Sequence, residues 1–288
     1  MKVLILGSGG QLGQSFLNSF RNSNIDIVGL SRKDMDITLS ENLKSVILKL
    51  SPDFVINTSA YTNVDESENN KKIANDINNI AVSNIANICC MANATLIHFS
   101  TDYIFNGELE VPYKENDIPD PQGIYGLTKL NGEKAIIASG CNYIIIRTSW
   151  VFSEHGKNFL KTMLRVSSEK KLNVVCDQFG CPTYAPDIAD GVIEILPKIY
   201  KKNINQIYHY TGKNVCSWAE FAEKIFEIAY KKQKIKNKPS VVKITSDNYK
   251  TLAKRPKFSV LDCSKVTDHF DLKLSDWKTG IDKSLRAL

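Results

Sequence analysis

KVLILGSGGQLG (residues 2–13) decides the fold class of this 288-residue chain, because it places a glycine-rich loop between a short apolar strand and a helix. Gly7 and Gly10 permit a tight turn in which the backbone can approach a pyrophosphate, and Gly13 lets the helix pack closely on the strand. The amino-terminal end of that helix then faces the anion. The stretch predicts a dinucleotide-binding site, with a merely permissive turn as the alternative.

The alternation of strand and helix continues through the first 150 residues. We expect strands at residues 3–6, 25–30, 54–57, 95–99 and 143–147. We expect helices at residues 12–20, 40–50, 77–92 and 125–139. Thr38 and Glu41 have the spacing of a capping box for the second helix, with Ser40 as the competing cap. The predicted fold class is α/β, a doubly wound parallel sheet of the Rossmann type.

The sequence after Trp150 predicts a smaller, mixed α/β lobe. We expect helices at residues 158–169 and 186–199, a strand at 207–210, and a helix at 221–232 that follows a capping box of Ser217 and Glu220. Residues 1–150 are expected to form the dinucleotide-binding domain, with interleaved return segments after 150. Residues 151–288 are expected to form mainly the substrate-binding lobe.

Composition excludes several classes of protein. With 43% hydrophobic and 24% charged residues, the chain is neither disordered nor collagenous, and no apolar run approaches the ~18 residues that a membrane span needs. Seven cysteines without a CxxC spacing predict reduced thiols and a cytoplasmic location, and no signal peptide is expected. The net charge of +6 comes from the last third, where lysines crowd residues 231–238. Without interleaved aromatics this run predicts a solvated helix end and no nucleic-acid partner.

The end of the second predicted strand bears on the choice of cofactor. Ser31 and Arg32 lie where an NAD-binding protein usually carries an acid, and a hydroxyl with a cation suits a 2′-phosphate. NADPH is therefore the favoured cofactor. Asp34 and Asp36 keep NADH open, and a solvated loop is the alternative interpretation of Arg32 and Lys33.

A tyrosine and a lysine predict the chemistry. Tyr125 and Lys129 lie four residues apart at the start of a helix, so both side chains emerge on one face. Reduction of a ketone leaves an alkoxide that needs a proton, and a neighbouring ammonium lowers the pKa of a tyrosine, ordinarily about 10. Lys129 can also hydrogen-bond a cofactor ribose. Taken alone, this spacing is also typical of a plain helix surface.

Thr101 completes the predicted catalytic set. It follows an apolar strand, and in open α/β sheets the chemistry lies beyond the carboxyl ends of the strands. There its hydroxyl can hydrogen-bond both Tyr125 and a substrate carbonyl. The alternative is that Thr101 and Asp102 only cap a turn.

Motifs along the whole chain carry a family resemblance. Besides the glycine loop they are Asn57-Thr-Ser-Ala-Tyr-Thr-x-Val-Asp65, Ser100-Thr-Asp-Tyr103, Tyr125-Gly-x-Thr-Lys129, Arg147-Thr-Ser-Trp-Val151, Asp177-Gln-x-Gly-x-Pro-Thr183 and Arg255-Pro-x-x-Ser-x-Leu-Asp262. Together they resemble the dTDP-4-dehydrorhamnose reductase family of extended short-chain dehydrogenases. The resemblance implies NAD(P)H-dependent reduction of the 4-keto group of dTDP-6-deoxy-L-lyxo-4-hexulose to dTDP-L-rhamnose, the last step of dTDP-rhamnose biosynthesis.

The resemblance also implies roles for matching residues. For the cofactor, these are Gly10, Gln11 and Leu12 at the pyrophosphate, Asp36 and Ile37 by the adenine, and Ala60, Tyr61 and Thr62 along the dinucleotide. For the sugar, they are Thr101, Asp102, Tyr103 and Trp150. Tyr125 is implied as the proton donor and Lys129 as the partner that lowers its pKa.

Three further predictions concern the substrate and the assembly. Arg255 can grip a diphosphate in forked geometry, with a surface arginine as the alternative, and Gln178 and Thr183 can meet nucleotide or hydroxyl groups. Some family members dimerise through a metal held by an acid just after the glycine loop, where this chain has Gln14 and Ser15. We therefore expect no metal-mediated dimer, and a monomer or weak homodimer. The four histidines are scattered without ligand spacing, so we expect no metal.

Two other hypotheses stay open. One is a reductase or epimerase of another nucleotide-linked deoxysugar, and the other is a non-catalytic dinucleotide-binding regulatory subunit. The joint presence of Thr101, Tyr125 and Lys129 argues against the regulatory hypothesis, because a binding module needs no proton donor beside a lysine.

Overall fold

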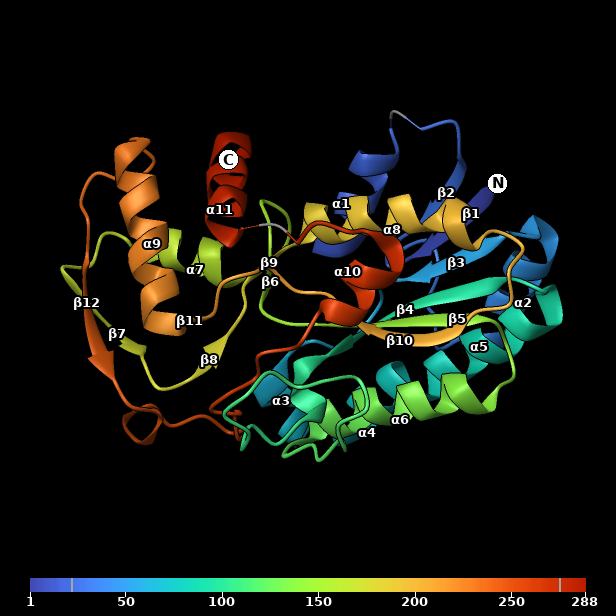
Figure 1. The fold of residues 1–288 in the computed structure, drawn as a ribbon, viewed down its shortest axis with the longest axis horizontal. Coiled ribbons are helices and arrows are strands. Elements are labelled where there is room, and N and C mark those ends of the chain that lie inside the picture. The colour runs from blue at the N-terminus through green and yellow to red at the C-terminus, as the bar shows by residue number, and fades with distance from the viewer. Residues whose placement is uncertain (22, 275) are drawn as a thin grey trace.

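A six-stranded parallel sheet forms the centre of the molecule in the computed structural model, which describes residues 1–21, 23–274 and 276–288 (Figure 1). Its strands are β1 (Lys2–Leu6), β2 (Asp26–Leu30), β3 (Phe54–Asn57), β4 (Thr95–Thr101), β5 (Tyr143–Thr148) and β10 (Asn205–His209). They lie in the order β2-β1-β3-β4-β5-β10. The predicted doubly wound α/β fold is confirmed.

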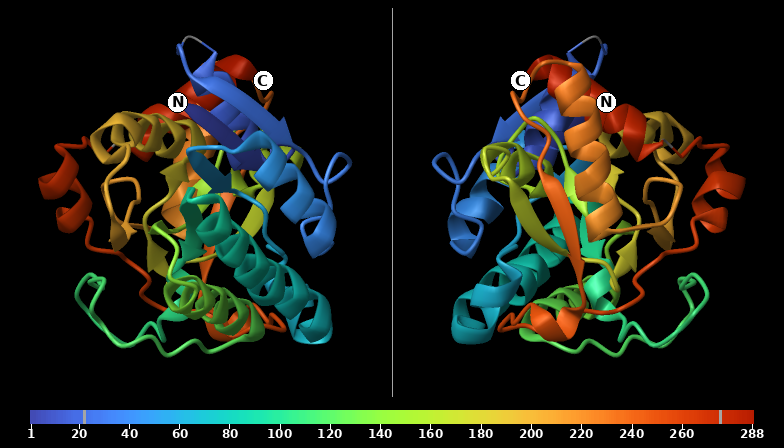
Figure 2. Two further views of the ribbon diagram at one scale, coloured as in Figure 1. Left: turned by 90° about the vertical axis from the view of Figure 1, so that its right-hand side faces the viewer. Right: turned by 90° about the vertical axis from the view of Figure 1, so that its left-hand side faces the viewer.

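Helices cover both faces of this sheet (Figure 2). One face carries α1 (Gln11–Phe20), α8 (Ala185–Ile199) and α10 (Ser264–Phe270), and the other carries α2 (Ser40–Leu50), α5 (Ala81–Ala92) and α6 (Ile124–Ala138). Successive side chains of a strand point to opposite faces. Val3 and Ile5 accordingly join the core that contains Phe16, whereas Leu4 and Leu6 join the opposite core.

Two helix starts differ from the prediction. No side chain caps α2: its N-cap is Leu39, and the backbone and hydroxyl of Thr38 both donate to Asp36 Oδ1, at 3.0 and 2.7 Å. The predicted capping box of Thr38 and Glu41 is therefore wrong, because Asp36 takes the Thr38 hydroxyl. The segment before α5 comprises α3 (Val64–Asn69), α4 (Lys71–Asn75) and a π-helical turn (Asp76–Ile80), so the expected helix at 77–92 begins with that turn.

A second, smaller lobe lies at the left of Figure 1. It contains α7 (Phe159–Arg165), α9 (Trp218–Lys231) and α11 (Trp277–Ala287), with the parallel pair β7 (Lys171–Val175) and β12 (Ser240–Ile244). Its core includes Phe152, Phe221 and Trp277. Short pairs join β6 (Val151–Phe152) to β9 (Thr183–Tyr184), and β8 (Phe179–Gly180) to β11 (Cys216–Ser217).

The helix ends in this lobe follow local hydrogen bonding. The capping box of Ser217 and Glu220 is confirmed: Glu220 N donates to Ser217 Oγ at 3.2 Å and Ser217 N donates to Glu220 Oε2 at 2.7 Å. The helix expected at 158–169 stops at Arg165, because the Ser167 hydroxyl donates to Leu164 O and the chain then enters β7. The solvated-end interpretation of the lysine run fits α9, where Lys231 pairs with Glu227.

The strand order changes direction beside β1. The chain runs from β1 outward to β2 and then crosses to β3 on the other side of β1. At such a switch point the loops after the two strands diverge and leave a crevice at the carboxyl edge of the sheet. The glycine loop after β1 and the segment after β3 therefore face one another, with Gly7 against Ser59.

We find no helix among the described residues with the length and apolarity that a membrane crossing requires.

Candidate active site

A cavity of about 970 Å³ occupies the switch point. Its walls come from the glycine loop, the end of β2, the segment after β3 and the α4–α5 region, and they include Gly7, Gly10, Ser31, Arg32, Asp36, Ile37 and Ala60. A side chain at Gly13 would bring Cβ within 2.4 Å of Gly7 O, so this position needs glycine for contact between α1 and the loop. Gly7 has a φ of +79°, in the left-handed region that glycine adopts freely.

The start of α1 presents backbone N–H groups beside this cavity. The first intrahelical bond that closes on the loop runs from Gln14 N to Gly10 O, so the earlier N–H groups at Gln11 and Leu12 precede it. Such an end suits an anion, as does the absence of an acidic residue from the first turn.

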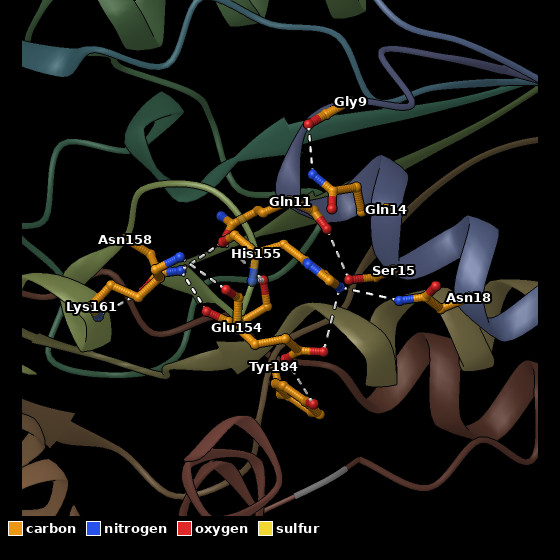
Figure 3. A network of polar contacts seen from close by, with 11 residues as sticks. Gly9, Gln11, Gln14, Ser15, Asn18, Glu154, His155, Asn158, Lys161 and Tyr184 are labelled. Carbon is orange, nitrogen blue, oxygen red and sulfur yellow. Dashed lines mark hydrogen bonds and ion pairs between the residues drawn. The ribbon is translucent and has the colours of Figure 1, made fainter. Parts of the chain in front are cut away.

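The Gln11 side chain is hydrogen-bonded at both its nitrogen and its oxygen and is not available as a phosphate ligand (Figure 3). Its Nε2 donates to Val151 O at 3.1 Å, and its Oε1 accepts from Ser153 Oγ at 3.4 Å and from Asn158 Nδ2 at 3.2 Å. Only the backbone of Gln11 remains for a phosphate. This network also joins α1 to the second lobe through Asn18 Nδ2 and His155 Nε2, 3.1 Å apart.

The end of β2 holds its acidic residues in local turns. The Ser31 hydroxyl donates to Asp34 Oδ2 at 2.6 Å and is not free, while Arg32 lines the cavity. Hydrogen bonds from Ser31 lower the pKa of Asp34, and those from Thr38 lower the pKa of Asp36. Two cations, Arg32 and Lys33, and the carboxylate of Asp36 thus line the cavity at the end of β2.

Only some of the predicted residues in the segment after β3 line a cavity. Ala60 lines the cavity, and both Ala60 and Thr62 line the cleft described next. Tyr61 instead exchanges backbone hydrogen bonds with the side chain of Asn78, at 2.8 and 3.1 Å, and the walls of the two cavities do not include it. Its contribution is to fix the segment on the π-helical turn.

A cleft of about 550 Å³ continues from the switch point toward the second lobe. Gly10, Ala60 and Ser59 border both hollows. The cleft brings together the predicted residues Leu12, Thr101, Asp102, Tyr103, Tyr125, Lys129, Trp150 and Arg255. Residues as far apart in the sequence as Leu12 and Arg255 thus surround one space. Thr101 lies at the carboxyl end of β4, and Tyr125 and Lys129 lie on the first turns of α6.

Burial shifts the pKa values of both Lys129 and Tyr125. Lys129 is 2% exposed and donates to Phe99 O at 2.6 Å, and burial lowers its pKa to about 8. Burial raises the pKa of Tyr125 to about 12, while Thr101 acts in the opposite direction. In this structure the Lys129 amine points toward β4, where it donates to Phe99 O, and the lowering of the tyrosine pKa by Lys129 stays a prediction.

Thr101 is held by its neighbour. Its hydroxyl donates to Asp102 Oδ1 at 3.0 Å and accepts from Tyr103 N at 3.2 Å. Asp102 is 2% exposed, and burial raises its pKa to about 6. Tyr103 packs edge-on against Tyr125, with ring centroids 5.7 Å apart.

Buried polar atoms without a partner gather around the cleft. Among the described residues they include Ser100 Oγ, Asp102 Oδ2, Thr148 Oγ1 and Arg255 Nε, all from cleft-lining residues. Native proteins leave few such atoms, and a polar ligand would satisfy them. Ser100 and Thr148 were not predicted, although both end neighbouring strands of the sheet, which is the signal that could have identified them.

Trp150 lies in a strained conformation. Its φ is +48°, which a bulky residue rarely adopts. Its ring stacks on Trp218 with centroids 3.5 Å apart and an interplanar angle of 7°. Trp218 also lines the cleft and carried no signal in the sequence, since it begins α9 far from Trp150 along the chain.

Arg255 joins the cleft to a third hollow. Its Nη2 pairs with Asp65 Oδ2 at 2.9 Å, and it lines both the cleft and a cavity of about 1180 Å³ that Gln178 also lines. Thr183 does not point to a ligand: it is buried, and its hydroxyl donates to Cys181 O and accepts from Gly212 N. The described residues contain no cluster of three side chains suited to a metal ion.

Comparisons with known proteins identify the family of this chain. The chain matches the model of the RmlD substrate binding domain family over residues 1–288. It is 40% identical to the dTDP-4-dehydrorhamnose reductase of Aggregatibacter actinomycetemcomitans, over 99% of this chain and 98% of that protein. Two solved dTDP-4-dehydrorhamnose reductases superimpose closely. The one from Clostridium acetobutylicum has a TM-score of 0.92 at 34% identity, and the one from Bacillus anthracis, in complex with NADP, has a TM-score of 0.91 at 32% identity; each comparison covers 100% of this chain and 99% of the other. This chain belongs to the RmlD substrate binding domain family.

Proposed function

We propose that this protein reduces the 4-keto group of dTDP-6-deoxy-L-lyxo-4-hexulose with NADPH and forms dTDP-L-rhamnose. The observation that carries the proposal is that Thr101, Tyr125 and Lys129 line one cleft that continues from the cavity at the glycine loop. The relatives reported above, which are 40, 34 and 32% identical to this chain, are dTDP-4-dehydrorhamnose reductases, and one of them was solved with NADP.

The cofactor would lie along the switch point. The backbone at Gly10, Gln11 and Leu12 would hold the pyrophosphate, and Arg32 would face the 2′-phosphate while Ile37 packs near the adenine. NADPH supplies the hydride when bound. Asp34 and Asp36 carry lowered pKa values and stay ionised. We therefore expect the protein to use NADH as well, with an affinity equal to or lower than its affinity for NADPH.

The catalytic residues would act on the substrate oxygen. Tyr125 gives its proton to the C4 oxygen as the hydride arrives at carbon, and Thr101 donates a hydrogen bond to the same oxygen. For this, the Thr101 hydroxyl must turn away from Asp102 Oδ1. The unpartnered Ser100 and Thr148 hydroxyls offer further contacts to a sugar.

The substrate would extend from the cleft past Arg255. The guanidinium borders both the sugar-sized cleft and the larger third hollow, so it suits a diphosphate between the two. Trp150 offers an aromatic face to the deoxysugar, with Asp102 and Tyr103 beside it. In this arrangement residues 1–150, completed by α8 and β10, hold mainly the cofactor, and residues 151–288 hold mainly the substrate.

The location, the oligomeric state and the partners of the protein are also proposals. We propose a cytoplasmic enzyme, a monomer or weak homodimer, without a nucleic-acid partner. The seven thiols are free in the structure, and the lysines at the end of α9 pair with acidic residues, Lys231 with Glu227 and Lys232 with Asp282.

Oxidation of NADPH and of NADH, with the 4-keto sugar generated on dTDP in the same mixture, tests the function. We expect rapid oxidation that is lost by at least a hundredfold in Tyr125→Phe, because general acid catalysis contributes about 10²–10⁴. The variant should still bind NADPH. If the folded wild-type protein binds NADPH but oxidises none, the rhamnose assignment fails in favour of another sugar or a regulatory subunit.

A further inference from the structure

A buried chain of polar groups runs from the segment after β3 to Lys129. Ser59 N donates to Asn57 Oδ1 at 3.0 Å, Asn57 Nδ2 lies 3.2 Å from His98 Nδ1, and His98 Nε2 lies 3.3 Å from Lys129 Nζ. Lys129 Nζ then donates to Phe99 O. Asn57, His98 and Lys129 are 1%, 0% and 2% exposed, so their hydrogen bonds do not depend on bulk water.

The direction of each hydrogen bond follows from the first one. A backbone N–H can only donate, so Ser59 fixes the oxygen of the Asn57 amide on its own side. The amide nitrogen, a donor, then faces His98 Nδ1, which must accept. A neutral imidazole that accepts at Nδ1 carries its proton at Nε2, and in His98 that nitrogen faces Lys129.

This orientation conflicts with an ammonium at Lys129. An ammonium has three donors and no acceptor, so two N–H groups would oppose each other at 3.3 Å. The neutral amine accepts from His98 and still donates to Phe99 O. A proton moved to His98 Nδ1 would oppose the Asn57 amide instead, and a flipped amide would leave Ser59 N without its acceptor.

We propose that Asn57 and His98 are positioning residues that stabilise the neutral amine of Lys129, so that this lysine gives its proton readily to Tyr125 in each catalytic cycle. The proposal rests on the proposed function and extends it. Tyr125 passes its proton to the substrate oxygen and becomes a phenolate. For the return of a proton to that phenolate, the Lys129 ammonium must turn from Phe99 O toward the cleft that both side chains line. Lys129 then becomes the amine that accepts from His98, and water in the cleft reprotonates it.

The other charged groups near Asn57, His98 and Lys129 do not stabilise the neutral amine of Lys129. Glu133 on α6 favours the ammonium of Lys129, but its carboxylate is paired with Arg147 of β5 at 2.8 Å. Asp102 acts on Tyr125. Burial and the neighbouring Lys129 hold the pKa of His98 well below its ordinary value, so His98 stays neutral and cannot relieve the conflict by taking a second proton.

The tautomer of His98 gives the first test, and it needs no variant. Nitrogen-15 NMR of the imidazole in the protein without substrate should show the proton at Nε2. The Nδ1–H tautomer in the wild-type protein would overturn the proposal. Because this measurement involves no turnover, the tautomer can be as expected even if the reductase assay fails, and the reverse also holds.

Asn57→Asp gives the second test. A carboxylate of the same shape accepts from both Ser59 N–H and His98, so the imidazole proton should move to Nδ1 and leave Nε2 to accept from the ammonium. We expect the pKa of Lys129, followed by carbon-13 at Cε, to rise by about one unit or more. The alkaline limb of kcat/KM should move upward by a similar amount.

Two controls separate this relay from the added charge alone. In a His98→Phe background, Asn57→Asp keeps its charge but lacks the imidazole, and the rise in the Lys129 pKa should be mostly lost. An equal rise in that background would overturn the proposal. Asn78→Asp makes the same change at another buried asparagine, which contacts Tyr61 and Thr128, and should leave the His98 tautomer unchanged. A changed tautomer there would contradict the specific role of Asn57.

Discussion

Burial of the Asp102 side chain opposes the ionisation of its carboxyl group. Its carboxyl is almost fully enclosed, one oxygen accepts from Thr101, and the other has no hydrogen-bond partner among the residues that the structure describes. Desolvation disfavours the charged form, which accounts for its pKa of about 6. In the protonated form Asp102 can donate to Thr101, which frees the Thr101 hydroxyl to donate to a substrate oxygen.

Asp102→Asn should therefore stabilise the protein in a pH-dependent way. The pKa of Asp102 is raised in the folded state, so ionisation costs folding free energy above about pH 6, and this cost disappears as the pH falls toward the ordinary value of 3.8. We expect a gain of about 2 kcal/mol at pH 8 that shrinks by pH 5, as measured by urea unfolding.

The exposed Asp268 offers a control for this substitution. Asp268→Asn removes a surface carboxylate on α10 and should change stability by less than about 0.5 kcal/mol at either pH. A gain in Asp102→Asn that is equal at pH 5 and pH 8 would show that the buried charge is not its cause.

At the scale of elements, the glycine loop and α1 form a single unit. A Cβ at Gly13 would collide with Gly7 O at 2.4 Å, whereas a Cβ at Gly10 would lie 3.4 Å from the same atom, which is ordinary contact. The two glycines therefore have separable roles. Gly13 is required for packing, and Gly10 keeps the approach to the start of the helix open.

Gly10→Ala and Gly13→Ala should differ accordingly. Gly10→Ala should keep the thermal stability within a few degrees and weaken NADPH binding by about tenfold or more, because its methyl occupies the phosphate approach. Gly13→Ala should lose about 1–3 kcal/mol of stability as well as binding. Thermal unfolding and NADPH fluorescence titration measure the two effects, and undiminished binding in Gly10→Ala would contradict the phosphate role of the loop.

Sequence-based prediction succeeded for features that have a local sequence pattern and failed for features that depend on contacts between distant residues. The strands and helices of the sheet region have local periodicity, and Thr101, Tyr125 and Lys129 could be placed together because all lie at the carboxyl edge of one sheet. The strand β7 was missed because its pairing partner, β12, begins at Ser240. The pairing of Arg255 with Asp65 spans 190 residues, and no local pattern signals it.

At the scale of the whole molecule, the stacked indoles of Trp150 and Trp218 both pack against the core of the second lobe, beside the cleft. Trp150 lies two residues after the end of β5, and Trp218 begins α9 of the second lobe, where it packs on Phe159. The strained backbone of Trp150 is held by the bond from Thr183 N to Trp150 O. The stack therefore fixes the aromatic wall that would meet the sugar.

Trp218→Leu should loosen this wall. We expect KM for the sugar nucleotide to rise up to about tenfold, since an aromatic pair contributes about 0.5–1.5 kcal/mol, while NADPH binding stays near the wild-type value. The circular dichroism signal of the coupled indoles should disappear. Phe159→Leu, behind Trp218 and away from the cleft walls, should retain that signal. An unchanged KM in Trp218→Leu would show that the stack does not shape the sugar site.

The edge strand β10 has a consequence for how the protein is made. The last strand of the sheet consists of residues 205–209, and α10, residues 264–270, seals one face, so the sheet region is not complete when its first five strands have left the ribosome. Until then β5 exposes an unpaired edge, which is a site for wrong strand pairing. Nascent chains that stop near residue 150 should therefore recruit chaperones, and the two lobes cannot be exchanged between relatives as independent cassettes.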